Sequence, residues 1–196
     1  MSALKIAVII GSTRPGRNGK KVADWVMTQA AGRTTAEYEL LDLADYPLPH
    51  LDEAVSAKAG PDLYSKDHTK AWAAKIAEYD GYVFVTPEYN HSTSGVLKNA
   101  IDFLYHEWTN KAAGLVSYGA VGGARAIEHL RGVLSELQVA HVQQQVSFSM
   151  FTDFENFSEL RPAEMHTGGA QLLFDQLESW AGALRTVREA ALTPAA

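Results

Sequence analysis

The sequence contains no cysteine among its 196 residues. This absence excludes disulfide bonds, thiolate metal sites, dithiol redox motifs and cysteine nucleophiles, and with them the cysteine-dependent phosphatases. The seven histidines show no spacing typical of metal ligands, so no metal site is predicted. A mechanism based on sulfur or on a bound metal ion is therefore not expected.

Long apolar runs are missing as well, since none approaches the roughly 20 residues that span a bilayer. The N-terminal segment "MSALKIAVIIGS" is basic and then apolar, as a signal sequence is. Its apolar part, however, is β-branched and only about five residues long, and a basic loop follows where a cleavage site would lie. We interpret it as a first core strand, and expect a cytoplasmic protein without membrane association.

The net charge of −6 at pH 7 makes a nucleic-acid partner unfavourable, because the overall field repels a polyanion. One segment nevertheless carries only basic charges. Between residues 11 and 23 no acidic residue occurs, and the basic residues there are Arg14, Arg17, Lys20 and Lys21. This segment is either a solvated basic turn or the binding site of a small anionic ligand.

Short apolar runs alternate with segments of helical period along the whole chain. The predicted strands are 5–10, 37–43, 81–86, 112–117 and 141–149. The predicted helices are 19–31, 66–79, 95–105, 122–137 and 168–188. This alternation predicts an α/β fold with a parallel sheet and helices on both faces. We expect a single domain over residues 1–196, with long loops at 45–65 and 150–166, the second polar and aromatic, and a disordered tail after about residue 189.

The first loop, "GSTRPGRNGKK", joins a strand to a helix, and free amides at helix N-termini bind phosphate. It lacks the Lys and the hydroxyl residue of a Walker loop, because Arg17 and Asn18 follow Gly16. It also lacks the second Gly of a dinucleotide-binding fingerprint. A terminal monophosphate remains as the expected ligand, held by Ser12, Thr13, Asn18 and Arg14. A polar turn with a helix cap is the structural alternative.

The second unusual loop, "TPEYNHSTSG", follows the buried strand at 81–86. In an open parallel sheet, ligands bind beyond the carboxyl ends of the strands, where the strand order reverses. For the order 2-1-3-4-5 this point lies between the first and third strands. We therefore predict that the first loop and the second loop line one cleft.

Three segments resemble the NADPH-dependent FMN reductase family: "GSTRPGRNGKKVADWV", "TPEYNHSTSGVLKNAIDF" and "SYGAVGGARAIEHLRGVLSEL". The resemblance covers about residues 4–145 and implies a flavodoxin-like three-layer sandwich that binds FMN. It implies an oxidoreductase that takes hydride from NADPH or NADH and passes electrons to a flavin, quinone, azo compound or similar small-molecule acceptor. The hydride chemistry would be carried by FMN without a catalytic side chain, in a homodimer or homotetramer.

The resemblance also implies the residues of the site. Those expected to hold the FMN phosphate are Ser12, Arg14, Arg17 and Asn18. Those expected along the isoalloxazine ring and ribityl chain are Pro87, Glu88, Tyr89 and Asn90, with the backbone amides of 88–90 meeting the pyrimidine edge. Those expected at the far edge of the ring are Ser117, Tyr118, Gly119, Gly122 and Gly123. Two positions depart from the family pattern: Asn18 replaces a common Ser, and Ser94 replaces a common Pro and is predicted to cap the next helix instead.

Other residues near these motifs have open or structural interpretations. We interpret Glu88 as structural rather than as a base, and His91 as a surface residue. Arg125 has two interpretations, a contact to a nicotinamide phosphate and a contact to an acid at a subunit interface. Three interpretations are open for the large aromatic residues, namely that they lie in the core, in a lid or at an interface. These residues are Trp72, Trp108 and the group at 151–157.

Two further functions are compatible with the same fold: a flavodoxin-like electron carrier and a binding protein that senses flavin redox state. The modest charge and the Gly- and Ser-rich second loop favour an enzyme over a carrier. The sequence does not decide between NADPH and NADH, or among the possible acceptors.

Overall fold

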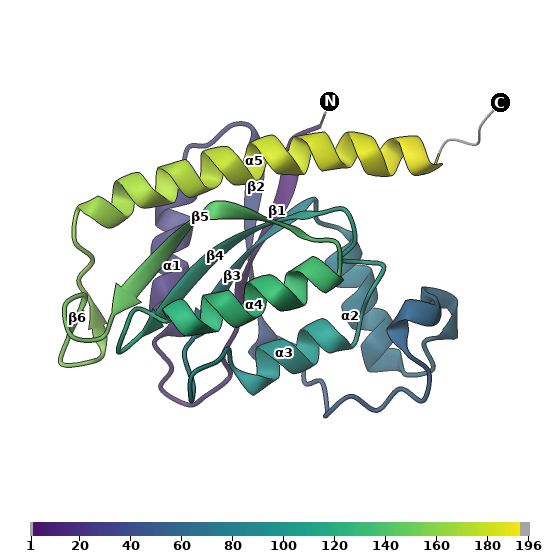
Figure 1. Cartoon of the computed structure of the whole chain (residues 1–196), viewed down its shortest axis with the longest axis horizontal. Helices are drawn as coiled ribbons and strands as arrows, with labels where there is room; N and C mark the ends of the chain where they lie inside the picture. The colour runs from purple at the N-terminus through teal and green to yellow at the C-terminus, as the bar shows by residue number, and fades with distance from the viewer. Residues whose placement is uncertain (1, 193–196) are drawn as a thin grey trace.

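The structure, a computed structural model, describes residues 2–192. Its centre is a five-stranded sheet of order β2-β1-β3-β4-β5 between two layers of helices (Figure 1). The strands are β1 (Leu4–Ile10), β2 (Ala36–Asp42), β3 (Gly81–Pro87), β4 (Ala112–Gly119) and β5 (Ala140–Ser149). Neighbouring strands of this sheet run parallel. The predicted flavodoxin-like order is confirmed.

Two helices pack on one face of the sheet, α1 (Gly19–Ala30) and α5 (Met165–Leu192). The other face is covered by α2 (Asp67–Ala77), α3 (Gly95–Asp102) and α4 (Ala124–Glu136), as Figure 1 shows. Short 3-10 helices lie between β2 and α2: η1 (Leu43–Asp45), η2 (Ala57–Ala59) and η3 (Pro61–Leu63). No helix within residues 2–192 is both long and apolar enough to cross a membrane.

Several element boundaries differ from the predicted ones. Helix α4 begins at Ala124 rather than at 122, because Gly122 and Gly123 have φ of 73° and 75° and therefore cannot be helical. Helix α5 continues to Leu192, past the predicted start of a disordered tail, and residues 193–196 lie outside the described part. The segment predicted as a loop at 150–166 contains an antiparallel hairpin, β6 (Phe154–Glu155) and β7 (Glu159–Leu160).

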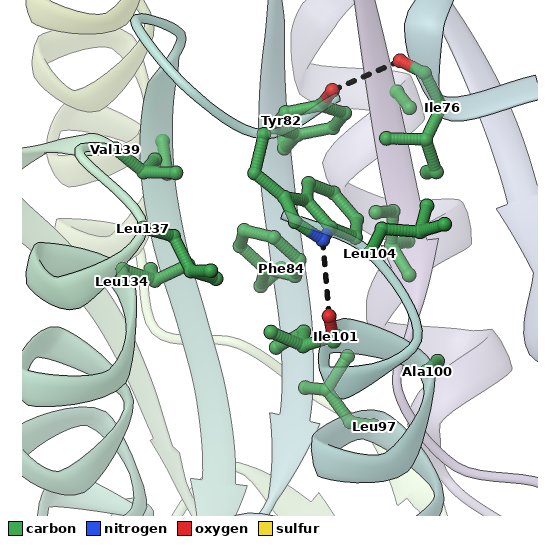
Figure 2. Packing of buried hydrophobic residues seen from close by; sticks show 14 of the residues in the cluster. Ile76, Tyr82, Phe84, Leu97, Ala100, Ile101, Leu104, Leu134, Leu137 and Val139 are labelled. Atoms are coloured by element: carbon green, nitrogen blue, oxygen red, sulfur yellow. Dashed lines mark hydrogen bonds between the residues drawn. The ribbon is translucent and has the colours of Figure 1, made fainter. Parts of the chain in front are cut away.

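The core lies on both faces of the sheet, so the central strands β3 and β4 are buried along their whole length. On the face of α3 and α4, Tyr82 and Phe84 of β3 belong to one core cluster with Leu97 and Leu134, and the Tyr82 side chain points toward Ile76 (Figure 2). Buried aromatic side chains with a polar atom need a partner. The Tyr82 hydroxyl accordingly donates to the Ile76 carbonyl at 3.0 Å.

The two tryptophans whose role was open belong to this core. Trp72 and Trp108 are 1% and 0% exposed. Their indole N–H groups donate to the carbonyls of Ala100, at 2.8 Å, and Ile101, at 3.1 Å. Both residues therefore fix α3 against the sheet, and neither is a lid or an interface residue.

A charged cluster closes the amino-terminal edge of the sheet. Asp80, which directly precedes β3, forms ion pairs with Arg185 and Arg188 of α5 and accepts a bond from the backbone amide of Lys5 at 2.9 Å. Burial alone would raise the pKa of Asp80, but Arg185 and the Lys5 amide hold it below its ordinary value. The cluster ties the last helix to the starts of β1 and β3.

Lys111 is buried at the same edge, directly before β4. Its ammonium group donates to the Ile76 carbonyl at 2.9 Å and to the Tyr82 hydroxyl at 3.0 Å. Burial, with a smaller contribution from Arg188, lowers the pKa of Lys111 to about 7. This lysine therefore titrates near neutral pH.

Candidate functional site

A cleft of about 400 Å³ lies at the carboxyl edge of the sheet, between the loops that follow β1, β3 and β4. The predicted site residues that line it are Arg14, Arg17, Asn18, Pro87, Glu88, Tyr89, Tyr118 and Gly119. The loops after β1 and β3, which are far apart in the sequence, thus share one cleft, as we predicted.

Direct contacts hold these two loops together. The Gly11 amide donates to the Val85 carbonyl at 2.8 Å, and the hydroxyls of Ser12 and Tyr89 lie 3.0 Å apart. The Ser94 hydroxyl donates to the Gly11 carbonyl and also caps α3, as predicted. A Cβ atom at Gly11 would lie 2.8 Å from the Val85 carbonyl oxygen, so only glycine fits this approach.

Glu88 lines the cleft, but its carboxylate contacts the start of α4. Its side chain is only 5% exposed, pairs with the Arg125 guanidinium, and accepts a bond from the Arg125 amide at 3.2 Å. Burial alone would raise the pKa of Glu88, but these bonds from Arg125 hold it below its ordinary value. Glu88 is therefore an ionised anchor and not a base, and Arg125 has an acidic partner within its own chain.

The expected contact of backbone amides 88–90 with a flavin edge is wrong for two of the three amides. The Glu88 amide donates to the Tyr118 carbonyl at 3.0 Å, and the Tyr89 amide donates to the Ser92 carbonyl at 2.9 Å. A tight turn from Tyr89 to Ser92 causes the second bond, and in it Asn90 has a left-handed φ of 48°. Asn90 is exposed and does not line the cleft.

The remaining predicted residues lie behind the cleft wall. The Ser117 hydroxyl donates to the Gly122 carbonyl at 2.6 Å. A Cβ atom at Gly123 would lie 2.7 Å from the Ser117 Cβ. These three residues shape the turn that leads from β4 into α4. His91, on the other side of the second loop, is exposed, with its ring centroid 6.1 Å from that of His129.

The first turn of α1 forms one end of the cleft. Asn18 is the N-cap residue, but its side chain does not cap the helix and instead donates to the Phe157 carbonyl at 2.8 Å. Asn18 therefore does not cap this turn, and the side-chain oxygen nearest to its first amide, that of Gly19, is the Tyr118 hydroxyl. Amides at a helix N-terminus, together with the positive end of the helix dipole, favour an anion.

Buried polar atoms in the cleft strengthen this preference. Within residues 2–192, the Tyr118 hydroxyl and Arg17 Nε are buried without a hydrogen bond of good geometry. Burial raises the pKa of Tyr118, so its hydroxyl keeps its proton and can donate. Arg17 is already paired with Asp42, whereas Arg14 is exposed at the rim. Buried donor atoms without a well-formed hydrogen bond fit a phosphate monoester, which supplies acceptor oxygens.

Residues 4–153 match the model of a family described as NADPH-dependent FMN reductase. The chain belongs to this family. An NAD(P)H-dependent FMN reductase of Schizosaccharomyces pombe is 47% identical over 133 residues, which are 66% of each chain. A quinone reductase of Pseudomonas putida is 30% identical over 195 residues, which are 93% of this chain and 97% of the relative.

A solved structure agrees in fold. The flavoenzyme NAD(P)H:(acceptor) oxidoreductase of Paracoccus denitrificans superposes with a TM-score of 0.70 at 23% identity, over 90% of this chain and 98% of that one. The resemblance predicted from the sequence is confirmed. The protein is an FMN-dependent NAD(P)H oxidoreductase, with FMN as cofactor and NAD(P)H as hydride donor.

One wall of the reductase cleft was not predicted. The segment around the β6–β7 hairpin contributes Met150, Phe157 and Ser158 to the lining. The aromatic residues at 151–157 were noted in the sequence, but nothing there placed them beside the first loop. Phe154 is buried, whereas Phe151 and Phe157 are exposed, so only Phe154 belongs to the core.

Proposed function

We propose that the cleft holds FMN with its phosphate at the N-terminus of α1 and its ring between the second loop and the end of β4. The observation that carries this proposal is a helix start that Asn18 does not cap, beside two buried polar atoms, the Tyr118 hydroxyl and Arg17 Nε, that make no hydrogen bond of good geometry within residues 2–192. The residues assigned to the phosphate are Ser12, Arg14, Arg17 and Asn18. Those assigned to the ring and ribityl chain, directly or as support of the wall, are Pro87, Glu88, Tyr89, Asn90, Ser117, Tyr118, Gly119, Gly122 and Gly123.

When bound, FMN supplies a two-electron carrier between NAD(P)H and a small acceptor such as a quinone. The chain positions that carrier: Arg14 provides a cation at the rim, and the Tyr118 hydroxyl provides a donor inside the cleft. The ion pair of Glu88 and Arg125 fixes the second loop against α4. No side chain is assigned to proton transfer, and the protons of a hydroquinone product come from water.

We include a homodimer or homotetramer and a cytoplasmic location in the proposal. Exposed apolar side chains near the carboxyl edge support an assembly, since Val121 and Met165 are 56% and 77% exposed and lie in one hollow. The use of NAD(P)H, an intracellular coenzyme, supports the location. Sedimentation at micromolar concentration tests the assembly, and a purely monomeric protein would contradict it.

The purified protein tests the function directly. We expect it to bind FMN stoichiometrically, to lose its visible flavin absorbance when NADPH or NADH is added without oxygen, and to regain it when a quinone follows. Titration with riboflavin, which lacks the phosphate, is the matched control and should give much weaker binding. Failure to bind FMN in excess, or failure of both nicotinamides to reduce the bound flavin, would refute the proposal.

A further inference from the structure

Phe157 is an apolar ring at the mouth of the cleft. It lines the cleft, yet it is 61% exposed. Its backbone and that of Asn156 are left-handed, with φ of 55° and 51°. Such a conformation is unfavourable for a residue with a Cβ, and a bulky side chain rarely adopts it. The hairpin thus presents this ring to the cleft at a cost in backbone energy and without burying it in the core.

The hairpin is fixed to the first loop and to α1. The Phe157 carbonyl accepts from the Asn18 side chain at 2.8 Å, and the Ser158 carbonyl accepts from Lys21 Nζ at 2.7 Å. Lys21 also pairs with Glu159 at 3.0 Å. At the base of the hairpin, the Asp153 carbonyl accepts from the Arg161 amide at 2.7 Å. Phe157 therefore has a defined place relative to the predicted phosphate end of the cleft.

A second aromatic ring supports the first. The ring of Phe151 meets that of Phe157 edge to face, with centroids 5.9 Å apart and planes at 82°. This geometry is favourable for an aromatic pair. An edge-to-face contact covers only one face of one ring, and Phe151 is itself 69% exposed, so each ring keeps a face that a ligand can reach. Such an open face can stack on a planar ligand.

The ligand that suits this position is the exchanging substrate rather than the resident cofactor. Phe157 lies beyond residue 153, where the match to the family ends, whereas the predicted phosphate and ring residues lie inside the match. A residue outside the common part of the family is suited to select the acceptor. Its exposure places it where a second molecule must enter the cleft.

We propose that Phe157 is an acceptor-positioning residue, whose ring forms the wall on which a planar aromatic acceptor, such as a quinone, stacks in the mouth of the cleft. This inference rests on the proposed function, because it takes the cleft to be the flavin site. Lys21 acts through Phe157, by holding the hairpin at the distance that stacking requires.

The test compares the rates at which Phe157→Ala and the unaltered enzyme reduce two acceptors of different shape. The reduced enzyme is mixed with 2-methyl-1,4-naphthoquinone or with ferricyanide, a small octahedral ion that cannot stack. We expect the quinone concentration at half-maximal rate to rise about three- to tenfold, the range for loss of one aromatic contact. The ferricyanide rate and the FMN affinity should not change. Phe157→Trp should restore quinone affinity, and Trp180→Ala, which removes an exposed aromatic ring from α5, is the matched control.

The Lys21 contact gives a second, independent variant. Lys21→Met should also raise the quinone concentration at half-maximal rate. Lys20→Met should not, because among the described residues Lys20 pairs with Asp24 of its own helix and not with the hairpin. If the quinone concentration at half-maximal rate is unchanged in Phe157→Ala, the inference is overturned and the proposed function is left intact. Equal losses for quinone and ferricyanide, or weaker FMN binding, would also overturn it, because Phe157 would then act on the cofactor. Absence of FMN binding in the unaltered protein would instead refute the function.

Discussion

Arg125→Ala is expected to destabilise the protein in a manner that depends on pH. The substitution removes the guanidinium partner of Glu88 and leaves the bond from the backbone amide of residue 125 in place. The Glu88 carboxylate would then be a buried anion held by the backbone amides of residues 125 and 126, without a cationic partner. The second loop, which carries Pro87 and Tyr89 into the cleft, would lose its main tie to α4.

The magnitude follows from the exposure of the two side chains. A hydrogen bond to a charged group contributes about 1.5–3 kcal/mol, and loss of one partner of a fully buried pair costs about 3–5 kcal/mol. Glu88 is 5% exposed but Arg125 is 43% exposed, so water can reach the gap that the arginine leaves. We therefore expect a loss of about 2 kcal/mol at pH 7, or about 4–8 °C in Tm for a chain of this length.

The pH dependence distinguishes this mechanism from simple loss of packing. In the unaltered protein the pKa of Glu88 is lowered, so its contribution is present above the ordinary pKa of a glutamate and is lost as pH falls through the folded-state pKa. In Arg125→Ala the guanidinium no longer lowers that pKa, so the pKa of Glu88 rises and the cost of the substitution becomes smaller as Glu88 takes up a proton. The difference in unfolding free energy between the unaltered protein and Arg125→Ala should fall from about 2 kcal/mol at pH 7 to below about 1 kcal/mol at pH 4.

Urea unfolding at pH 4, 5, 6 and 7 measures these differences. Arg161→Ala is the matched control, because its partner Glu155 and the arginine itself are 58% and 71% exposed, and an exposed pair contributes at most about 1 kcal/mol. Glu88→Gln combined with Arg125→Ala should recover part of the loss at pH 7, since no buried charge remains. A penalty that stays constant from pH 7 to pH 4, with strictly additive double-variant energies, would refute the reasoning.

Three further changes test other parts of the structure. Arg14→Ala should weaken FMN binding about tenfold, through loss of one charge-assisted bond, and leave riboflavin binding unchanged in a fluorescence titration; equal weakening of both would argue against a phosphate contact. Gly11→Ala should lower the unfolding free energy by about 2 kcal/mol, because the new methyl group would meet the Val85 carbonyl; an unchanged urea midpoint would show that the loops can separate without cost. Lys111 has a lowered folded-state pKa of about 7, so the unfolded chain binds more protons above that pH and stability should rise from pH 7 to pH 9. Lys111→Met should remove this rise in urea unfolding, and a rise of equal size in the variant would assign it to another group.

The sequence predicted those features that repeat along the chain or follow from topology. The alternation of strands and helices gave the layers, and the strand order then brought the first and second loops together. Ser94 was predicted as a cap because capping needs only a local pattern. The pairing of Glu88 with Arg125 was not predicted, since it joins residues 37 positions apart that share no periodic pattern.

The errors have physical causes of the same kind. The backbone amides of 88–90 were expected to be free, but a turn within the second loop uses the Tyr89 amide. The sequence did not reveal this turn, because a turn produces no periodic pattern of hydrophobic residues. The β6–β7 hairpin was taken for a loop because its strands have two residues each, too few for an alternating pattern. Its position beside Asn18 depends on side-chain contacts that only coordinates reveal.

The cluster of Asp80, Arg185 and Arg188 has a practical consequence for protein engineering. It lies at the amino-terminal edge of the sheet, and β3, whose seven residues span roughly 20 Å, separates it from the cleft. Substitutions farther apart than about 7–10 Å generally combine additively. A thermostable version of this enzyme can therefore be sought by redesigning that edge first, and altered acceptor preference introduced afterwards at the opposite edge, without re-optimising either set.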